Sequence, residues 1–275
     1  MSPVHAAIAA LLLLAVPAFA QDKLQAPSDS AIAAAPNQEQ ITLGKRLLSE
    51  TKHLLPGNVG ASVNCTSCHL YEGKLAYGSP FTNSSRHFPS YNPRAGRTIT
   101  LAERINGCFL RSMNGTIVPE DSKEMQAMLA YIAWLAHDVP AGAEVAGDGL
   151  GKVNTALKPD PQHGAVVYAD QCASCHGVHG EGVKDRHGEF IFPPLWGEQS
   201  FNVGAGMART YTAAAFVKSN MPVAWGLNAP LGQGDALSDQ DAVDVAEYFT
   251  HQPRPDFPAK VKDWPNGGSP KDASY

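Results

Sequence analysis

The pattern C-x-x-C-H occurs twice in the chain, at residues 65–69 and 172–176. It is the attachment pattern of c-type haem, in which two thiols add to the vinyl groups of the porphyrin and the adjacent histidine reaches the iron. Two structural zinc knuckles are the alternative, although zinc does not need a histidine directly after the second cysteine. The sequence therefore predicts two covalently bound haem c groups, attached and ligated by Cys65, Cys68, His69, Cys172, Cys175 and His176.

Each haem iron needs a second axial donor opposite its histidine. After the second motif, Met221 lies in a loop constrained by Pro222 and precedes the last apolar helix. A thioether ligand raises the haem potential, which suits the exit of electrons. Met221 is therefore the predicted ligand of the second haem iron, and Met207, in a Gly-rich loop, is the alternative.

The first haem has two candidates for this position. Superposing the repeats nominates Met113, whereas Cys108 is a fifth cysteine that remains after both haems are attached. A free cysteine is most often a small buried hydrophobe. An odd cysteine in an exported protein nevertheless needs an explanation, and a reactive thiol is one.

The residues around Cys108 favour a reactive thiol over a cysteine that only packs in the core. Thr100 and Glu103 form a capping-box pattern, which predicts a helix from there to about Met113, with residues 114–115 as its stop. On this helix Arg104, Cys108 and Ser112 share one face.

The segment 86–111 is strongly basic. It has one acid and no lysine, and its five arginines are Arg86, Arg94, Arg97, Arg104 and Arg111. Arginine binds oxyanions in a planar, bidentate manner, and a positive field favours the thiolate form of a cysteine. The pattern predicts an oxyanion site beside Cys108. A solvated arginine face, or arginines that pair with haem propionates, are the alternatives.

Helices before and after each motif should position the haems. Short helices are predicted over residues 41–48 and 164–168, and longer amphipathic helices over 123–136 and 238–251. This order resembles the class I cytochrome c fold, in which two helices cross above the haem. We therefore expect a mainly α chain with two tandem class I cytochrome c domains.

The predicted organisation has five parts. They are a signal peptide over residues 1–20, a catalytic haem 1 domain over 39–143, a linker over 144–161, an electron-exit haem 2 domain over 162–252 and a surface tail over 253–275. The signal is a short apolar run that ends in the A-x-A pattern Ala18-Phe19-Ala20, and an uncleaved anchor is the alternative. We expect a periplasmic protein without stable membrane insertion.

The net charge of −5 over 275 residues gives no reason to expect a nucleic-acid partner. Because the chain has two haem motifs, we expect it to bind haem and to exchange electrons with a redox partner.

The stretch 104–115 resembles the thiosulfate dehydrogenases, which are exported dihaem c-type cytochromes. Its specific part is Arg-x-x-x-Cys-x-x-Arg-Ser-Met-Asn-Gly, and the resemblance extends over about residues 40–252. It implies His69 and Cys108 as axial ligands of the active-site haem, and His176 and Met221 as those of the second haem. It also implies a substrate site formed by Arg94, Arg104 and Ser112.

One family feature is altered in this chain. Some members have a lysine directly before the ligand methionine and exchange the two ligands with redox state. Asn220 occupies that position here, and Lys218 is a minor candidate for the exchange.

The resemblance implies that two thiosulfate anions are joined into tetrathionate, while their electrons pass through the haems to a small soluble cytochrome or a similar redox protein. Cys108 would carry a sulfur adduct of the first thiosulfate. The reverse reaction uses the same site. Two other readings stay open, namely a dihaem electron carrier with His/Met ligands that uses Met113, and a Sox-type sulfur-pathway cytochrome that acts with a second subunit.

Overall fold

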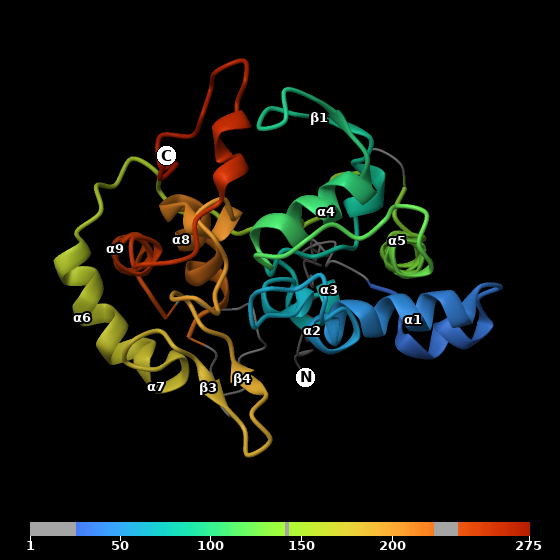
Figure 1. Ribbon diagram of the computed structural model, residues 1–275, viewed down its shortest axis with the longest axis horizontal. Coiled ribbons are helices and arrows are strands. Elements are labelled where there is room, and N and C mark those ends of the chain that lie inside the picture. The colour runs from blue at the N-terminus through green and yellow to red at the C-terminus, as the bar shows by residue number, and fades with distance from the viewer. Residues whose placement is uncertain (1–25, 141–142, 223–235) are drawn as a thin grey trace, which may run out of the picture.

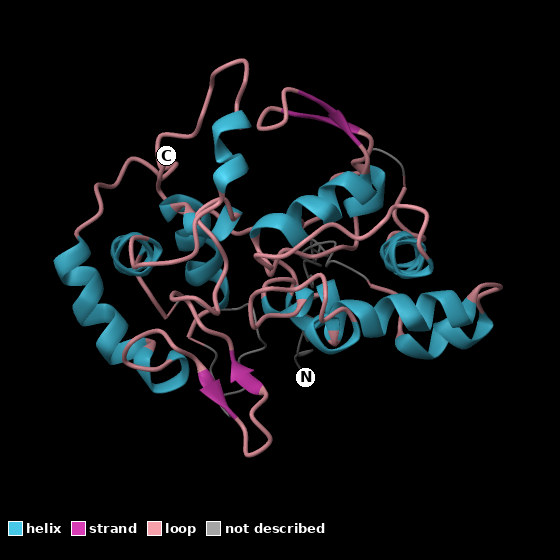
Figure 2. Cartoon of the chain, viewed as in Figure 1, coloured by secondary structure: helices cyan, strands magenta, loops and turns pink. Residues whose placement is uncertain are grey.

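The computed structural model describes residues 26–140, 143–222 and 236–275, so the predicted signal peptide lies outside it. Within these ranges, no helix is both long and apolar enough to cross a membrane. Helices and loops make up most of the described chain, and the strands form two small antiparallel hairpins (Figure 2).

The first domain contains α1 to α5 and one hairpin (Figure 1). Its helices are α1 (Gln38–Ser49), α2 (Thr51–Leu54), α3 (Leu70–Gly73), α4 (Leu101–Arg111) and α5 (Lys123–Leu135). In the hairpin, β1 (Ser90–Asn92) pairs with β2 (Arg97–Ile99), so that Ser90 lies opposite Ile99. One hydrophobic core joins α1, α4 and α5.

The second domain contains α6 to α9 and the other hairpin. Its elements are α6 (Pro161–Gln171), α7 (Ala173–His176), β3 (Val183–Lys184), β4 (Phe190–Phe192), α8 (Thr210–Asn220) and α9 (Asp239–Thr250). A separate core joins α6, α8 and α9. The β3–β4 hairpin extends away from the helices at the bottom of Figure 1.

In both domains a glycine lets the first helix cross the last one closely. A Cβ atom on Gly44 of α1 would lie 1.9 Å from the Ala127 carbonyl oxygen of α5. A Cβ atom on Gly164 of α6 would lie 2.0 Å from the Asp244 carbonyl oxygen of α9. The same crossing in each half confirms the predicted pair of class I cytochrome c domains.

Replacing Gly164 with Ala is expected to lower the free energy of unfolding by about 3 kcal/mol, because the new methyl group cannot fit against the α9 backbone. Chemical denaturation of the haem-loaded protein measures this change. Gly206→Ala is the matched control, since a Cβ atom at Gly206 meets nothing within 4 Å. Equal stability of the two variants would contradict the close crossing.

The predicted linker and tail both contact the two domains. The linker amide oxygen of Gly147 accepts a hydrogen bond from the Tyr77 N–H at 2.7 Å, and its Asn154 N–H donates to Asp239 at the start of α9. The tail includes the short 3₁₀ helix Pro258–Lys262 and lies at the top of Figure 1, between α8 and the β1–β2 hairpin. It was expected on the surface, but it buries Phe257 and the carboxylate of Asp263.

Candidate functional site

The first haem motif presents His69 in a fixed orientation. Its Nδ1 lies 2.5 Å from the Ser79 carbonyl oxygen, and its ring stacks on Phe81 with the ring centroids 4.1 Å apart. Because a carbonyl accepts the Nδ1 proton, the other ring nitrogen, Nε2, is left as the metal donor. This arrangement fits a histidine that ligates a haem iron.

Helix α4 presents Cys108 beside an arginine. The helix begins at the predicted capping box, in which Thr100 and Glu103 exchange hydrogen bonds, and it ends at Arg111, two residues earlier than expected. The Arg104 Nη1 donates to the Cys108 Sγ at 2.7 Å, and Ser112 follows the helix with helical backbone angles. The predicted shared face is therefore present, with Ser112 at its end.

The cysteines of the first domain differ in their electrostatic surroundings. Burial raises the pKa of Cys65 and of Cys68 to about 12. Burial also acts to raise the pKa of Cys108, but Arg104 and hydrogen bonding to His69 outweigh it and lower this pKa to about 6. Cys108 is therefore the cysteine of this group that is held as a thiolate, and it lies next to the motif histidine.

Met113 occupies a different environment from Cys108. Its side chain is 2% exposed and lies in the core of the first domain, with Phe109, Met125 and Met128. Its carbonyl oxygen accepts hydrogen bonds from the Gly60 and Ala61 N–H groups. This packing accounts for Met113 as a core residue, and it favours Cys108 over Met113 at the first haem.

The second haem motif borders a cavity of about 790 Å³, which is large enough for a large cofactor. Cys172, Cys175 and His176 line it, and both candidate methionines, Met221 and Met207, line it as well. The His176 Nδ1 lies 2.9 Å from the Pro193 carbonyl oxygen, which repeats the arrangement at His69. The donor set and the cavity size fit a haem attached at this motif.

The Lys218 side chain contacts residues at the start of α9. Its ammonium donates to the Leu237 carbonyl oxygen at 2.5 Å and lies 3.8 Å from Asp239, at the start of α9. Met221, not Lys218, contributes to the wall of the cavity.

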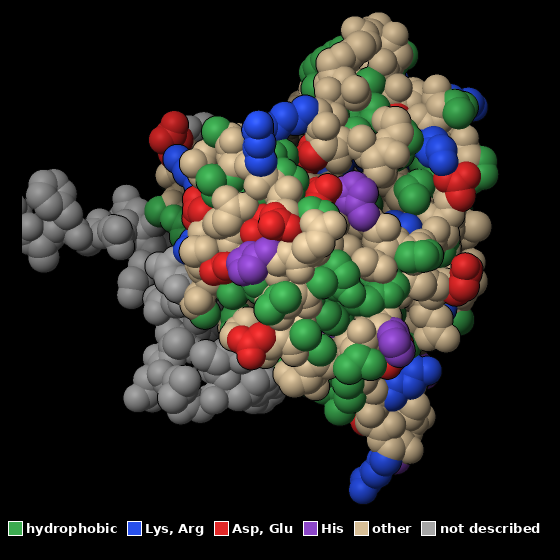
Figure 3. Space-filling view, turned by 90° about the vertical axis from the view of Figure 1, so that its left-hand side faces the viewer, with side chains coloured by type: hydrophobic (Ala, Val, Ile, Leu, Met, Phe, Trp, Pro, Cys, Tyr) green, Lys and Arg blue, Asp and Glu red, His purple; other side chains and the backbone are tan. Residues whose placement is uncertain are grey.

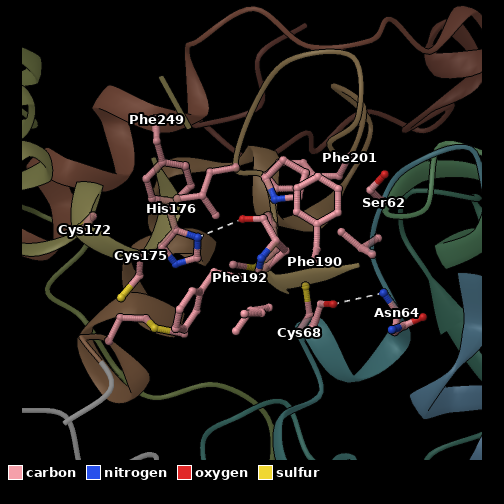
Figure 4. Close-up of a pocket in the computed structure, with 18 of the residues that line it drawn as sticks. Ser62, Asn64, Cys68, Cys172, Cys175, His176, Phe190, Phe192, Phe201 and Phe249 are labelled. Carbon is pink, nitrogen blue, oxygen red and sulfur yellow. Dashed lines mark hydrogen bonds between the residues drawn. The ribbon is translucent and has the colours of Figure 1, made fainter. Parts of the chain in front are cut away.

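The cavity also reaches the first haem motif. Cys68 and Asn64 of the first domain line it, on the side opposite Cys175 and His176 (Figure 4). Ser62 and Gln199 hydrogen-bond across this boundary, through the Ser62 N–H and the Gln199 carbonyl oxygen at 2.7 Å. The two attachment motifs therefore face each other across one space.

The five arginines of the segment 86–111 have different partners. Arg97 pairs with Glu103 at 2.6 Å, and Arg86 donates to the Ala136 carbonyl oxygen at 3.3 Å. Arg94 and Arg111 both face Asp263 of the tail, and Arg104 contacts the Cys108 sulfur. Of the predicted substrate residues, Arg104 contacts the Cys108 sulfur, Ser112 follows α4 and donates its N–H to the Cys108 carbonyl oxygen, and Arg94 contacts Gly204 and Asp263.

Asp263 of the tail binds two of these arginines. Its carboxylate accepts two hydrogen bonds from Arg111, at 2.9 and 2.7 Å, and lies 3.6 Å from the Arg94 Nε. The Tyr275 hydroxyl donates to it at 2.6 Å, and the Arg94 guanidinium lies over the Trp264 ring. We call Asp263 and these two arginines the tail clasp. The sequence did not predict a role for Asp263, because no local pattern distinguishes it from the other acids of the tail.

Comparisons with known proteins match both halves of the chain. The family described as "SoxA/TsdA, cytochrome c domain" matches residues 57–141, and the family "Cytochrome c" matches residues 161–252. The chain is 47% identical to a thiosulfate dehydrogenase of Psychrobacter arcticus, over 84% of this chain and 68% of that protein. It is 44% identical to a thiosulfate dehydrogenase of Allochromatium vinosum, over 80% of each.

A solved structure is also similar. Thiosulfate dehydrogenase TsdBA from Marichromatium purpuratum, in its "as isolated" form, matches with a TM-score of 0.76 and 37% identity. The match covers 86% of this chain, which spans half the length of that one. Each of the two cytochrome c domains carries one haem c, and the chain belongs to the thiosulfate dehydrogenase family.

Proposed function

We propose that the protein is a periplasmic thiosulfate dehydrogenase, which joins two thiosulfate anions into tetrathionate and passes two electrons to a small soluble cytochrome. The observation that carries this proposal is Cys108, which lies between the Arg104 guanidinium and the motif histidine His69. A plain electron carrier has no use for a thiolate paired with an arginine. The names of the relatives support the same substrate.

The chain offers one pair of axial donors to each haem. His69 and Cys108 are the proposed pair at the first haem, and His176 and Met221 the pair at the second. The bound haems supply the oxidant, because each ferric iron accepts one electron. Thiolate ligation gives a low potential and thioether ligation a high one, so this pairing favours electron flow from the first haem to the second.

Cys108 is the proposed nucleophile and carrier of sulfur. Once released from the iron, its thiolate would bond to the outer sulfur of one thiosulfate, which gives a Cys–S–S–SO₃⁻ adduct and two electrons that the two bound haems would accept, one each. A second thiosulfate then attacks the sulfur that joins Cys108 to the sulfonate group. The bond to Cys108 breaks, tetrathionate leaves, and the thiolate returns with its electron pair. Tetrathionate reduction would run both steps backwards: the Cys108 thiolate attacks tetrathionate and releases one thiosulfate, and two electrons then cleave the adduct to release the second.

Arg104 on α4 and Ser112, which directly follows it, are the proposed substrate contacts. Two dianions repel each other strongly where water is scarce, and a fixed guanidinium offsets this repulsion. Ser112 can donate a hydrogen bond to a sulfonate oxygen. Arg94 is the third predicted contact. Its Nη1 donates to the Gly204 carbonyl oxygen at 2.6 Å, so a substrate role would use its remaining N–H groups.

Electrons are proposed to leave through the second domain. Its outer face carries hydrophobic side chains at the centre and basic side chains at the tip of the β3–β4 hairpin (Figure 3). The hairpin also forms a wall of the cavity at the second motif, through Lys184, Phe190 and Ile191. Exposed Val166, Val178 and Ile191 belong to this domain. A redox partner that docks here would lie close to the second haem.

Replacing Arg104 with Ala is expected to lower kcat/KM for thiosulfate about a hundredfold, because a charge-assisted contact to the anion and to the Cys108 thiolate is lost. Steady-state kinetics with an artificial electron acceptor measure this. Arg97→Ala is the matched control, since Arg97 pairs with Glu103 on the surface, and its kinetics should match the wild type. Unchanged kinetics in Arg104→Ala would remove Arg104 from the substrate site.

The proposed function is tested by mixing the oxidised protein with thiosulfate and no other acceptor. Both haems should become reduced, and tetrathionate should form at one molecule per two electrons. Haems that stay oxidised with thiosulfate but are reduced by ascorbate would make the protein a carrier. Reduction that needs a second protein as sulfur acceptor would instead support a Sox-type cytochrome, a reading that the SoxA/TsdA family match keeps open.

A further inference from the structure

Arg254 lies four residues after the end of α9, and its guanidinium is held inside the protein. Its Nη2 donates to the Phe249 carbonyl oxygen at 2.6 Å, and the guanidinium lies 4.4 Å from the centre of the Phe201 ring. Its Nε and Nη1 atoms are fully buried and have no hydrogen-bond partner among the described residues. Two of the three nitrogens of this cation are therefore unsatisfied.

Such a group is costly unless an anion accompanies it. Burial lowers the pKa of Arg254 to about 10, which still leaves it charged at neutral pH. An unpaired buried charge is strongly destabilising, and buried charges in proteins are paired as a rule. Arg111 follows this rule, because it is also largely buried and meets the Asp263 carboxylate in a bidentate pair. No acid among the described residues pairs with Arg254 in this way.

The neighbours of Arg254 show where its anion would lie. Phe201 and Phe249, which hold the guanidinium, both line the cavity that contains Cys172 and His176 (Figure 4). A haem attached there brings two propionate groups, which are carboxylates with the geometry that a guanidinium binds best. We propose that Arg254 binds a propionate of the second haem through Nε and Nη1. This assignment depends on the haem and not on the thiosulfate chemistry.

The contact has a consequence for electron transfer. A cation held near the haem in a region of low dielectric stabilises the iron after it gains an electron. It also neutralises the propionate, whose negative charge favours the ferric state. Arg254 therefore raises the potential of the second haem and adds to the effect of a thioether ligand.

The test uses the full, haem-loaded protein. Arg254→Gln and Arg254→Met both remove the charge, and the apolar Met side chain also fits over the Phe201 ring. Spectropotentiometric titration then follows each haem separately, since thiolate and thioether ligation give different spectra. At a fixed ambient potential, the ratio of reduced to oxidised second haem is expected to fall about tenfold, which is about 59 mV for a one-electron couple. Arg254→Lys, which keeps the charge, should restore most of this ratio.

Lys158→Gln is the matched control, because it removes one positive charge from an exposed position just before α6, outside the residues that line the cavity, and should leave both potentials unchanged. The mass of the denatured chain must show two haems in every variant that is titrated. A second-haem potential equal to the wild type in the Gln and Met variants would overturn the proposal. So would a shift confined to the first haem. Loss of thiosulfate oxidation with an unchanged second-haem potential would likewise count against it.

Discussion

Replacing Cys108 with Gly is expected to abolish thiosulfate oxidation, with turnover lowered at least about a thousandfold, while both haems remain covalently attached. The nucleophile that would carry the sulfur adduct is then gone, and Arg104 loses the thiolate that it contacts. The second haem should still accept electrons from a chemical reductant, because its ligands lie in the other domain. Activity assays, the haem spectrum and the mass of the denatured chain together measure this result.

Two further variants distinguish the role of Cys108 as a nucleophile from its role as an iron ligand. Cys108→Met restores a neutral sulfur donor to the iron but should stay inactive, since a thioether cannot form and release the adduct. Met113→Leu should keep both activity and spectrum, because Met113 lies in the core of the first domain. Normal activity in Cys108→Gly would refute the proposed mechanism. An altered haem spectrum in Met113→Leu would instead support the carrier with Met113 as ligand.

Replacing Asp263 with Ala is expected to lower the free energy of unfolding by about 3–5 kcal/mol, the usual cost of breaking a buried ion pair from one side. The Asp263 carboxylate is 4% exposed and compensates Arg111 and Arg94, which would be left partly buried without an acid. Denaturant titration of the haem-loaded protein, followed by circular dichroism, measures the loss.

The matched control for Asp263 is another aspartate of the tail. Asp256 is 62% exposed and pairs with Lys260 on the surface, where such pairs contribute little. Asp256→Ala should therefore leave the unfolding midpoint where it is. A midpoint for Asp263→Ala that also equals the wild type would show that the tail clasp does not contribute to stability.

The sequence predicted the features that depend on local patterns. The haem motifs and the capping box at Thr100 are encoded within a few residues, and the predicted helices appear where they were expected. The shared face of Arg104 and Cys108 follows from helical spacing alone, and the structure places these two side chains in contact.

The features that the sequence did not predict depend on contacts between distant residues. Arg94 and Arg104 are both arginines of the same basic segment, yet Arg94 meets Asp263 of the tail and Arg104 meets the Cys108 sulfur. Arg111 and its partner Asp263 are separated by 152 positions, and no periodicity connects them. The surroundings of Arg254 are likewise set by a ring, Phe201, from another loop. Charge counted along the chain therefore does not predict which partner each arginine meets.

The tail clasp also determines whether the two domains can unfold independently of each other. Arg94 and Arg111 belong to the first domain, but their counter-charge arrives from residues that follow the second. Opening of the tail would therefore weaken the first domain as well, which couples the two halves into one cooperative unit. Native-state hydrogen exchange should show the amides of α4 and of the tail becoming exposed in the same opening event. A fragment cut at residue 143 would retain the first haem motif but lack the acid that α4 needs.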